Sequence, residues 1–269
     1  MPYVCRDCCA SLPRWQGQCP TCKGWHIIHQ PDQSETIPAP NGHTLKKISK
    51  INVRSLPIYT THIPALDAAL GGGLPRGTTT LFTGDPGIGK STLLLQAISN
   101  LAESEMCAYI SAEETDQQIA RRARRIGLAK SRAHIFQTDD VDGIIDALQS
   151  EKVSICIVDS IQAIESMQID YPKGSIAQIR ECTLQLVNAS QRLNVTTIIV
   201  CHVAGDGTLA GPRTIEHLAD AILYLERDAE NSIDSPGEKF VNIYAEKNRN
   251  GPILQRHRMR MTEKGLISV

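Results

Sequence analysis

The segment from Gly84 to Thr92 constrains this chain more than any other part of its sequence. It reads Gly84, Asp85, Pro86, Gly87, Ile88, Gly89, Lys90, Ser91 and Thr92, and so matches the pattern GxxxxGK[ST]. A β-branched run precedes it at Thr79–Thr83, and a leucine-rich helical pattern follows at Ser91–Ala102. In such a strand–loop–helix setting, the backbone N–H groups of a glycine-rich turn surround phosphates at the positive end of a helix. The segment therefore predicts a nucleotide-binding loop, or P-loop.

Lys90 and Ser91 have the residue types that phosphate chemistry requires in this loop. We expect the Lys90 ammonium to reach the β- and γ-phosphates of ATP and the Ser91 hydroxyl to bind Mg²⁺. The second magnesium ligand of such a site is a carboxylate at the end of a neighbouring strand. Asp159 ends the apolar run Ser154–Asp159 and is the candidate, although an aspartate in this place is also a common helix cap. The cofactors that follow are ATP and Mg²⁺.

Two glutamates follow another apolar run, Cys107–Ser111, at the same predicted edge of the sheet. Hydrolysis of ATP needs a group that orients or deprotonates water, and a carboxylate at this edge can do so. We predict Glu113 as the catalytic base. Glu114 remains the alternative, since it can also be an acidic residue in the first turn of a helix over 115–126, where it favours the helix dipole.

Short β-rich apolar runs alternate with helical segments from residue 58 onward. This alternation predicts an α/β fold, a P-loop core with a mostly parallel sheet and helices on its faces. The expected strands are Thr79–Thr83, Cys107–Ser111, His134–Gln137, Ile155–Asp159, Thr197–His202, Ala221–Glu226 and Phe240–Ala245. Two long connections, Ser160–Gly174 and Val203–His217, follow strands at the edge where open α/β sheets usually bind ligands.

Composition agrees with one such domain and a small appendage. The chain has 269 residues, of which 41% are apolar and 21% charged, and this excludes wholesale disorder and a fibrous chain. The net charge of −1 leaves nucleic-acid binding to be judged from local clusters. No apolar run approaches the ~18 residues of a membrane span, and no signal peptide is evident, so we expect a cytoplasmic protein. The polar residues 30–57 are a predicted linker to an ATPase domain over 58–269.

Residues 1–29 contain two CxxC pairs, Cys5 with Cys8 and Cys19 with Cys22. Each pair places two thiolates on one tight turn, and together they can close a tetrahedral four-cysteine site for Zn²⁺ of the zinc-ribbon type. Because so short a segment has little core, the zinc would be structural. An iron–sulfur cluster and a thioredoxin-like redox pair are the alternatives.

Polar side chains near two other strand ends are candidates for phosphate contacts. Lys247, Asn248 and Arg249 follow the last expected strand and precede a glycine after Asn250, the arrangement of a loop that presents charge. Their partner is DNA or a nucleotide at a subunit boundary, and the sequence leaves both open. His202 ends the expected strand Thr197–His202, directly before one of the long connections, where it can sense a γ-phosphate; a strand-end histidine that faces solvent is the alternative.

Several motifs taken together resemble the RadA, or Sms, family of bacterial RecA-like ATPases. They are Arg14–Cys22, Leu70–Gly73, the P-loop, Val158–Gln162, Gly207–Pro212 and Lys247–Arg249. The resemblance covers nearly the whole chain. It implies a DNA-dependent ATPase of homologous recombination and DNA repair that binds single-stranded and branched DNA. It further implies a ring-shaped, helicase-like homo-oligomer that acts with a RecA-type recombinase.

This sequence departs from the family pattern in three respects. Asn250 occupies the position of an aromatic residue in the family's KNRFG motif, and Ala204–Gly205 stands where a Thr-Lys pair follows the histidine. The family also continues into a Lon-protease-like domain that supports its ring, and this sequence stops where that domain would begin. We therefore expect DNA affinity and, above all, oligomerisation to be weakened.

Two other functions are compatible with the motifs. A RecA-fold regulatory ATPase or autokinase of the KaiC type also carries paired glutamates after the corresponding strand, but the cysteine module and the single core argue against it. A non-catalytic, nucleotide-gated repair adaptor would bind ATP tightly with negligible turnover.

Overall fold

The computed structural model describes residues 57–202, 215–228 and 239–269, together with 3–5, 11–12, 14, 16–18, 20 and 28–29. The chain divides into two compact units, Met1–Arg54 and Ser55–Val269. In the first unit, strand β1 (Tyr3–Cys5) lies between β2 (Ser11–Leu12) and β3 (Ile28–His29) and pairs with both in antiparallel fashion.

Most of the predicted zinc site lies outside the described residues. This holds for Cys8, Cys19 and Cys22, and for Cys5 only the backbone within β1 is described. The same holds for the predicted linker up to residue 56. The zinc module and the linker therefore remain predictions.

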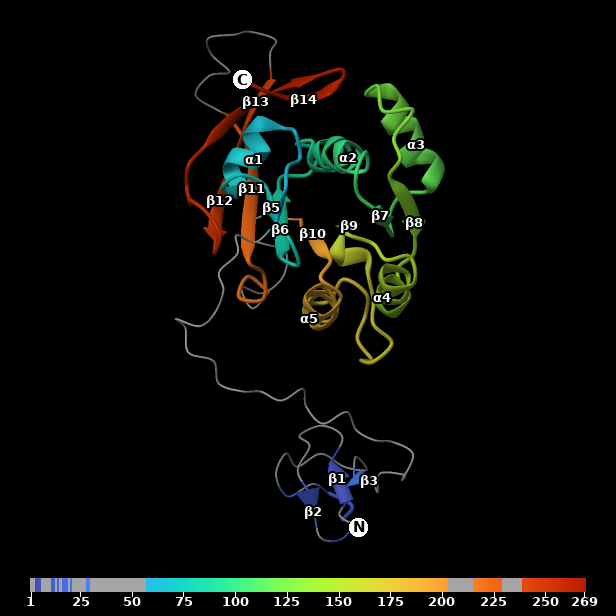
Figure 1. Ribbon diagram of the computed structural model, residues 1–269. Helices are drawn as coiled ribbons and strands as arrows, with labels where there is room; N and C mark the ends of the chain where they lie inside the picture. Colours follow the sequence, from blue (N-terminus) through green and yellow to red (C-terminus); the bar gives the residue numbers. More distant parts are fainter. Residues whose placement is uncertain are drawn as a thin grey trace. The chain divides into compact units, whose positions relative to one another are not determined.

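A nine-stranded sheet forms the second unit, in the order β14-β13-β12-β11-β6-β10-β9-β7-β8 (Figure 1). The strands are β6 (Thr79–Gly84), β7 (Cys107–Ser111), β8 (His134–Gln137), β9 (Ile155–Asp159), β10 (Thr196–Val200), β11 (Ala221–Arg227), β12 (Lys239–Asn248), β13 (His257–Thr262) and β14 (Gly265–Ser268). The six strands from β11 to β8 are parallel, and β12 to β14 extend the sheet in antiparallel fashion. The predicted α/β fold with a mostly parallel sheet is confirmed.

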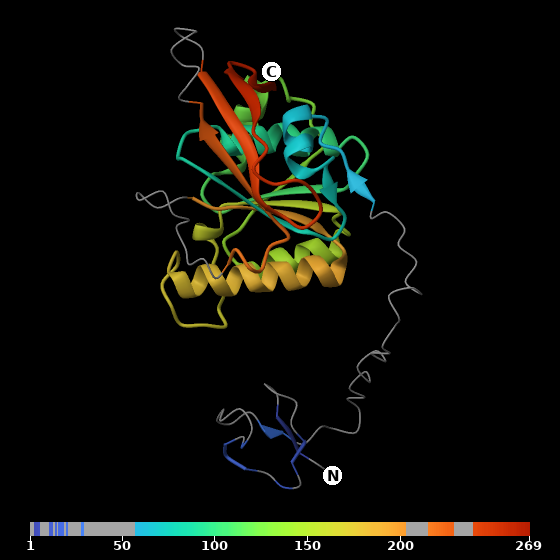
Figure 2. The same cartoon turned by 90° about the vertical axis from the view of Figure 1, so that its left-hand side faces the viewer.

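Helices cover both faces of this sheet and divide the core into two layers (Figures 1 and 2). One face carries α1 (Pro64–Leu70), α2 (Lys90–Leu101) and α3 (Asp116–Arg125), and the other carries α4 (Val141–Ser150) and α5 (Ile176–Leu193). Because the central strands are buried on both faces, every residue of β6, β7, β9 and β10 is buried, as the continuous apolar runs predict. A short 3-10 turn, η2 (Ile161–Ala163), follows β9.

Two of the predicted strand ends are wrong by two or more residues. Strand β10 stops at Val200, so His202 lies beyond the strand rather than at its last position. Strand β12 continues past Ala245 to Asn248, because Lys247 and Asn248 still pair with β11. The predicted charge-presenting loop is therefore shorter than expected, and two of its polar residues belong to the sheet.

Several elements have no counterpart in the sequence prediction. They include α1, the two-stranded sheet of β4 (Ile58–Tyr59) with β5 (Leu74–Pro75), α4 and the edge strand β14. Over the described parts of the chain, none of the helices has both the length and the apolar character needed to cross a membrane.

Candidate nucleotide site

The P-loop joins the central strand β6 to helix α2 at the carboxyl edge of the parallel strands. Gly84 begins the turn at a place where the backbones of two strands meet. A Cβ atom there would lie 2.2 Å from the carbonyl oxygen of Leu225 on β11, so only glycine fits. Gly89 has φ of 105° directly before Lys90, which begins α2. The loop therefore delivers the first N–H groups of α2 to the site, as phosphate binding requires.

Lys90 is 5% exposed and lies over the carbonyl groups of its own loop. Its Nζ atom donates hydrogen bonds to the backbone oxygens of Gly84, at 2.5 Å, and Asp85, at 2.9 Å. Burial lowers the pKa of Lys90, whereas the negative charges of Asp159 and Asp85 act in the opposite direction. The ammonium is thus held next to the loop by weak neutral acceptors, which an incoming phosphate can replace.

Asp159 ends β9 beside the end of β7, where it pairs in register with Ser111. Its side chain is 9% exposed, and its Oδ2 atom accepts a hydrogen bond from the Tyr109 hydroxyl. Because Asp159 contributes to the electrostatic environment of Lys90, the carboxylate and the ammonium belong to one site.

Glu113 lies at this site as well, beyond the end of β7. Its Oε1 atom accepts a hydrogen bond from the Ser160 hydroxyl and lies 3.7 Å from Nε2 of His202. The pKa of Glu113 is lowered, chiefly by the neighbouring His202 and then by the hydrogen bond from Ser160, with burial acting against them. The positive charge of Lys90 lowers the pKa of Glu113 further. The structure thus brings Lys90, Asp159, Glu113 and His202 together.

Glu114 has a different environment from Glu113. Its carboxylate forms an ion pair with Arg122 of α3, and its backbone N–H donates to the Ser111 hydroxyl at 3.1 Å. Helix α3 begins at a capping box formed by Thr115 and Gln118, one residue after Glu114. Glu114 is therefore occupied by a structural contact.

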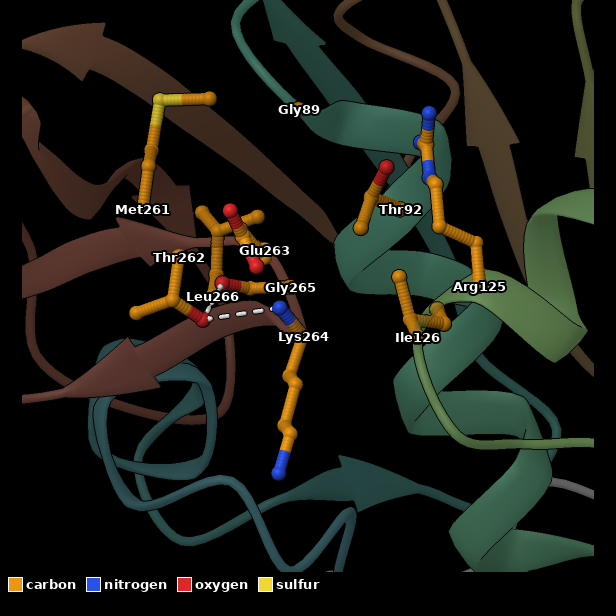
Figure 3. A pocket seen from close by; sticks show the side chains of 10 residues that line it. All are labelled: Gly89, Thr92, Arg125, Ile126, Met261, Thr262, Glu263, Lys264, Gly265 and Leu266. Atoms are coloured by element: carbon orange, nitrogen blue, oxygen red, sulfur yellow. Dashed lines mark hydrogen bonds between the residues drawn. The ribbon is translucent and has the colours of Figure 1, made fainter.

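A cavity of about 610 Å³ lies beside the P-loop. Figure 3 shows its lining, which comes from three parts of the chain: Gly89 and Thr92 from the P-loop, Arg125 and Ile126 from the end of α3, and Met261–Leu266 from the β13–β14 hairpin. Gln96 of α2 fixes this hairpin, because its side-chain amide accepts from the N–H of Leu266 at 2.9 Å and donates to the Leu266 carbonyl at 3.2 Å. No sequence motif indicated this cavity.

Lys247, Asn248 and Arg249 lie near the opposite end of the sheet from the P-loop, where the parallel strands begin. Asn248 pairs with Ala221, and Ala221 pairs with Thr80 near the start of β6. The four steps along the strand from Thr80 to Gly84 span about 13 Å, because a strand rises roughly 3.3 Å per residue. These three residues are therefore separated from the P-loop of their own chain by the length of β6.

Each of the three has a partner at that end of the sheet. Lys247 Nζ donates to the backbone oxygens of Glu216 and Ala219, both at 2.7 Å. Asn248 donates to the carbonyl of Leu70 at 3.0 Å, and Arg249 forms an exposed ion pair with Asp220 at 3.2 Å. The connection over 203–214 lies outside the described residues.

The oxygen groups at the P-loop suit Mg²⁺. A hydroxyl and one carboxylate, here Ser91 and Asp159, are typical protein ligands of Mg²⁺ bound with a nucleotide, because the phosphates and water supply the remaining oxygens. Within the described residues, no group of three or more His, Cys, Asp and Glu side chains can hold a metal ion by itself.

Comparison of the sequence and the fold with known proteins identifies the class of protein to which this domain is similar. Residues 59–134 match the protein family described as "ATPase: KaiC". A KaiC-like protein from Pyrococcus horikoshii has the same fold, with a TM-score of 0.65 at 22% identity over 80% of this chain and 99% of that one. The fold and the P-loop define a RecA-like ATPase domain, a class that uses ATP and Mg²⁺.

Relatives with a similar sequence narrow this class. The DNA repair protein RadA is 35% identical in Pseudomonas aeruginosa, 38% in Haemophilus influenzae and 33% in Escherichia coli, each over 99% of this chain. The chain spans 59% of the length of each of these relatives. The chain is thus similar in sequence to part of RadA, and its larger unit has the RecA-like fold.

Proposed function

We propose that this chain binds and hydrolyses ATP as part of a DNA-dependent ATPase of DNA repair. The observation that supports this most is the convergence of Lys90, Asp159 and Glu113 behind the P-loop. These are the cation, the metal-ligating carboxylate and the water-orienting carboxylate that phosphoryl transfer to water needs.

Each side chain has one part in the proposed reaction. Lys90 leaves its carbonyl partners and binds the β- and γ-phosphates, while Ser91 and Asp159 hold the magnesium ion. When bound, that ion neutralises charge on the phosphates. Glu113 has a lowered pKa and stays ionised near neutral pH, so it orients the attacking water and accepts its proton late in the reaction. His202 links the γ-phosphate to the start of the connection over 203–214.

The cavity beside the P-loop is suited to the base and ribose of the nucleotide. It begins at Gly89 and Thr92, where the phosphates end, and Ile126, Met261 and Leu266 supply apolar surface for a planar base. Arg125 adds a cation at its rim. ATP would thus lie between α2 and the β13–β14 hairpin.

The role in DNA repair rests on similarity to RadA. We infer single-stranded and branched DNA as ligands, a RecA-type recombinase as a partner, a ring-shaped homo-oligomer, and a structural zinc held by Cys5, Cys8, Cys19 and Cys22. Lys247 and Arg249 lie far from the nucleotide of their own chain. In this proposal they act on DNA or on the nucleotide of a neighbouring subunit.

The deciding experiment is steady-state ATP hydrolysis with and without single-stranded DNA, at two salt concentrations, for the wild-type chain and Lys90→Ala. We expect DNA to stimulate turnover, salt to weaken that stimulation and the variant to lose turnover. Wild-type turnover retained by Lys90→Ala in a pure preparation would refute the ATPase site. Turnover indifferent to DNA would refute DNA coupling in this chain, and labelled phosphate on the protein would point to an autokinase.

A further inference from the structure

Tyr109 is a buried residue next to the magnesium ligand that has no assigned role. It is 0% exposed in the middle of β7, and its ring belongs to the apolar layer beneath α2. Its hydroxyl donates a hydrogen bond to Oδ2 of Asp159. A buried aromatic ring therefore ends in a polar contact with the carboxylate on which the proposed metal site depends.

Strand register explains why this tyrosine reaches that carboxylate. Tyr109 pairs with Ile157 on β9, and Asp159 lies two residues further along the same face. Diagonal neighbours of this kind are about 7–8 Å apart, within the reach of an aromatic side chain. At this distance the ring fills the core, and its hydroxyl meets the carboxylate at the edge of the sheet.

The hydrogen bond runs from Tyr109 to Asp159. The phenol hydroxyl is the donor, and Oδ2 of the Asp159 carboxylate is the acceptor. Oδ2 of Asp159 is therefore occupied, which leaves Oδ1 for another ligand.

We propose that Tyr109 is a positioning residue, which holds the Asp159 carboxylate so that Oδ1 is available to the magnesium ion of bound MgATP. This rests on the proposed function. Residues that orient a metal ligand in this way commonly change metal affinity by about 10- to 100-fold when they are removed. A tyrosine that only fills the core would leave metal affinity unchanged when its hydroxyl is lost.

The test is Tyr109→Phe in the full chain, because phenylalanine keeps the ring and removes the donor. Mn²⁺ binding in the presence of a non-hydrolysable ATP analogue is measured by electron paramagnetic resonance. We expect binding to weaken about tenfold or more. Affinity for a fluorescent ATP analogue in excess chelator should stay within twofold of wild type. In kinetics, the half-saturating Mg²⁺ concentration rises by a similar factor, and saturating Mg²⁺ restores most of kcat.

Tyr224→Phe is the matched control. Tyr224 also forms a hydrogen bond with a carboxylate, that of Glu246, but it packs on the face of the sheet that carries α4 and α5. Its variant should bind Mn²⁺ as the wild type does. If both variants weaken Mn²⁺ binding equally, the effect is general and the proposal is wrong.

Two further outcomes decide the proposal. Unchanged Mn²⁺ affinity in a folded Tyr109→Phe protein would overturn it. In an Asp159→Asn background, Tyr109→Phe should weaken Mn²⁺ binding no further, and an additional loss there would show that Tyr109 does not act through Asp159. If the wild type binds no nucleotide, the proposed function itself fails, and this is distinct from failure of the Tyr109 role.

Discussion

The ion pair between Glu114 and Arg122 separates the roles of the two adjacent glutamates. Glu113 lies with Ser160 and His202 near Lys90, whereas Glu114 is bound to α3. We predict that Glu113→Gln lowers kcat by about 10²- to 10⁴-fold, the usual contribution of a proton-accepting group, while nucleotide affinity is kept. Glu114→Gln should retain kcat within a few-fold. Single-turnover hydrolysis measures both, and equal losses would contradict this assignment.

The neighbours of Glu113 predict a particular pH dependence. The pKa of Glu113 is lowered, so the stabilisation from its contacts with His202 and Ser160 is present above the ordinary glutamate pKa and is lost as the pH falls through the lowered value. Because His202 is the main cause, His202→Phe should move the acidic limb of the kcat profile to higher pH. Ser160→Ala should move it in the same direction by less. An acidic limb that stays in place in both variants would show that another group controls it.

The hydrogen bonds of Gln96 predict an effect on nucleotide affinity. Gln96→Ala removes both contacts with Leu266, each worth about 1 kcal/mol in a typical protein, and frees the β13–β14 hairpin from α2. We expect the KM for ATP to rise several-fold with little change in kcat, as is usual when an interaction common to substrate and transition state is lost. Gln185→Ala is the control, because Gln185 contacts Ser166 and Glu181 instead. A raised KM in the control would argue against a specific effect.

Lys247 and Arg249 should differ in their effect on stability. Lys247 holds two backbone carbonyls, so Lys247→Ala should lower the free energy of unfolding by about 2 kcal/mol. Arg249 forms an exposed ion pair, so Arg249→Ala should cost at most about 1 kcal/mol. Urea unfolding measures both.

The salt dependence of DNA binding then tests whether Arg249 contacts DNA. If Arg249 binds a phosphate, a plot of the logarithm of the DNA-binding constant against the logarithm of salt concentration becomes shallower by about 1 in Arg249→Ala. An unchanged slope would favour a neighbouring subunit as its partner.

The proposed zinc site can be tested through thiol reactivity. Burial raises the pKa of Cys107, Cys182 and Cys201 to about 12, so these thiols stay protonated and unreactive in the folded protein. We expect one zinc per chain by elemental analysis, and we expect chelation to expose four further reactive thiols. Cys19→Ser should reduce the zinc content to near zero, and full zinc occupancy in that variant would refute the site.

Local sequence predicts the parallel half of the fold well, because each central strand is a continuous apolar run that is buried on both faces. Local sequence also predicts the P-loop, because the whole motif lies within nine consecutive residues. The hairpin wall of the cavity could not be predicted. Leu266 meets Gln96 across 170 residues, and no local pattern encodes such a contact.

The end of β12 shows a second limit of sequence reasoning. A run of Lys, Asn and Arg before glycine is typical of an exposed loop, yet Lys247 and Asn248 donate hydrogen bonds to backbone carbonyls of neighbouring segments. The different roles of Glu113 and Glu114 likewise become clear only from the three-dimensional structure. There, Glu114 is bound by Arg122, which lies eight residues further along the chain.

The contact between Gln96 and Leu266 also has a consequence for folding. Because the proposed nucleotide cavity is lined by both α2 and the β13–β14 hairpin, tight binding of nucleotide there would require the sheet to have formed from β6 through β14. A ligand that binds only the folded state stabilises it by RT ln(1 + [L]/Kd), about 2.7 kcal/mol at a hundredfold excess over Kd. ATP would therefore stabilise only the fully folded domain. If ATP protects the chain from proteolysis, that protection would report that the whole core has formed.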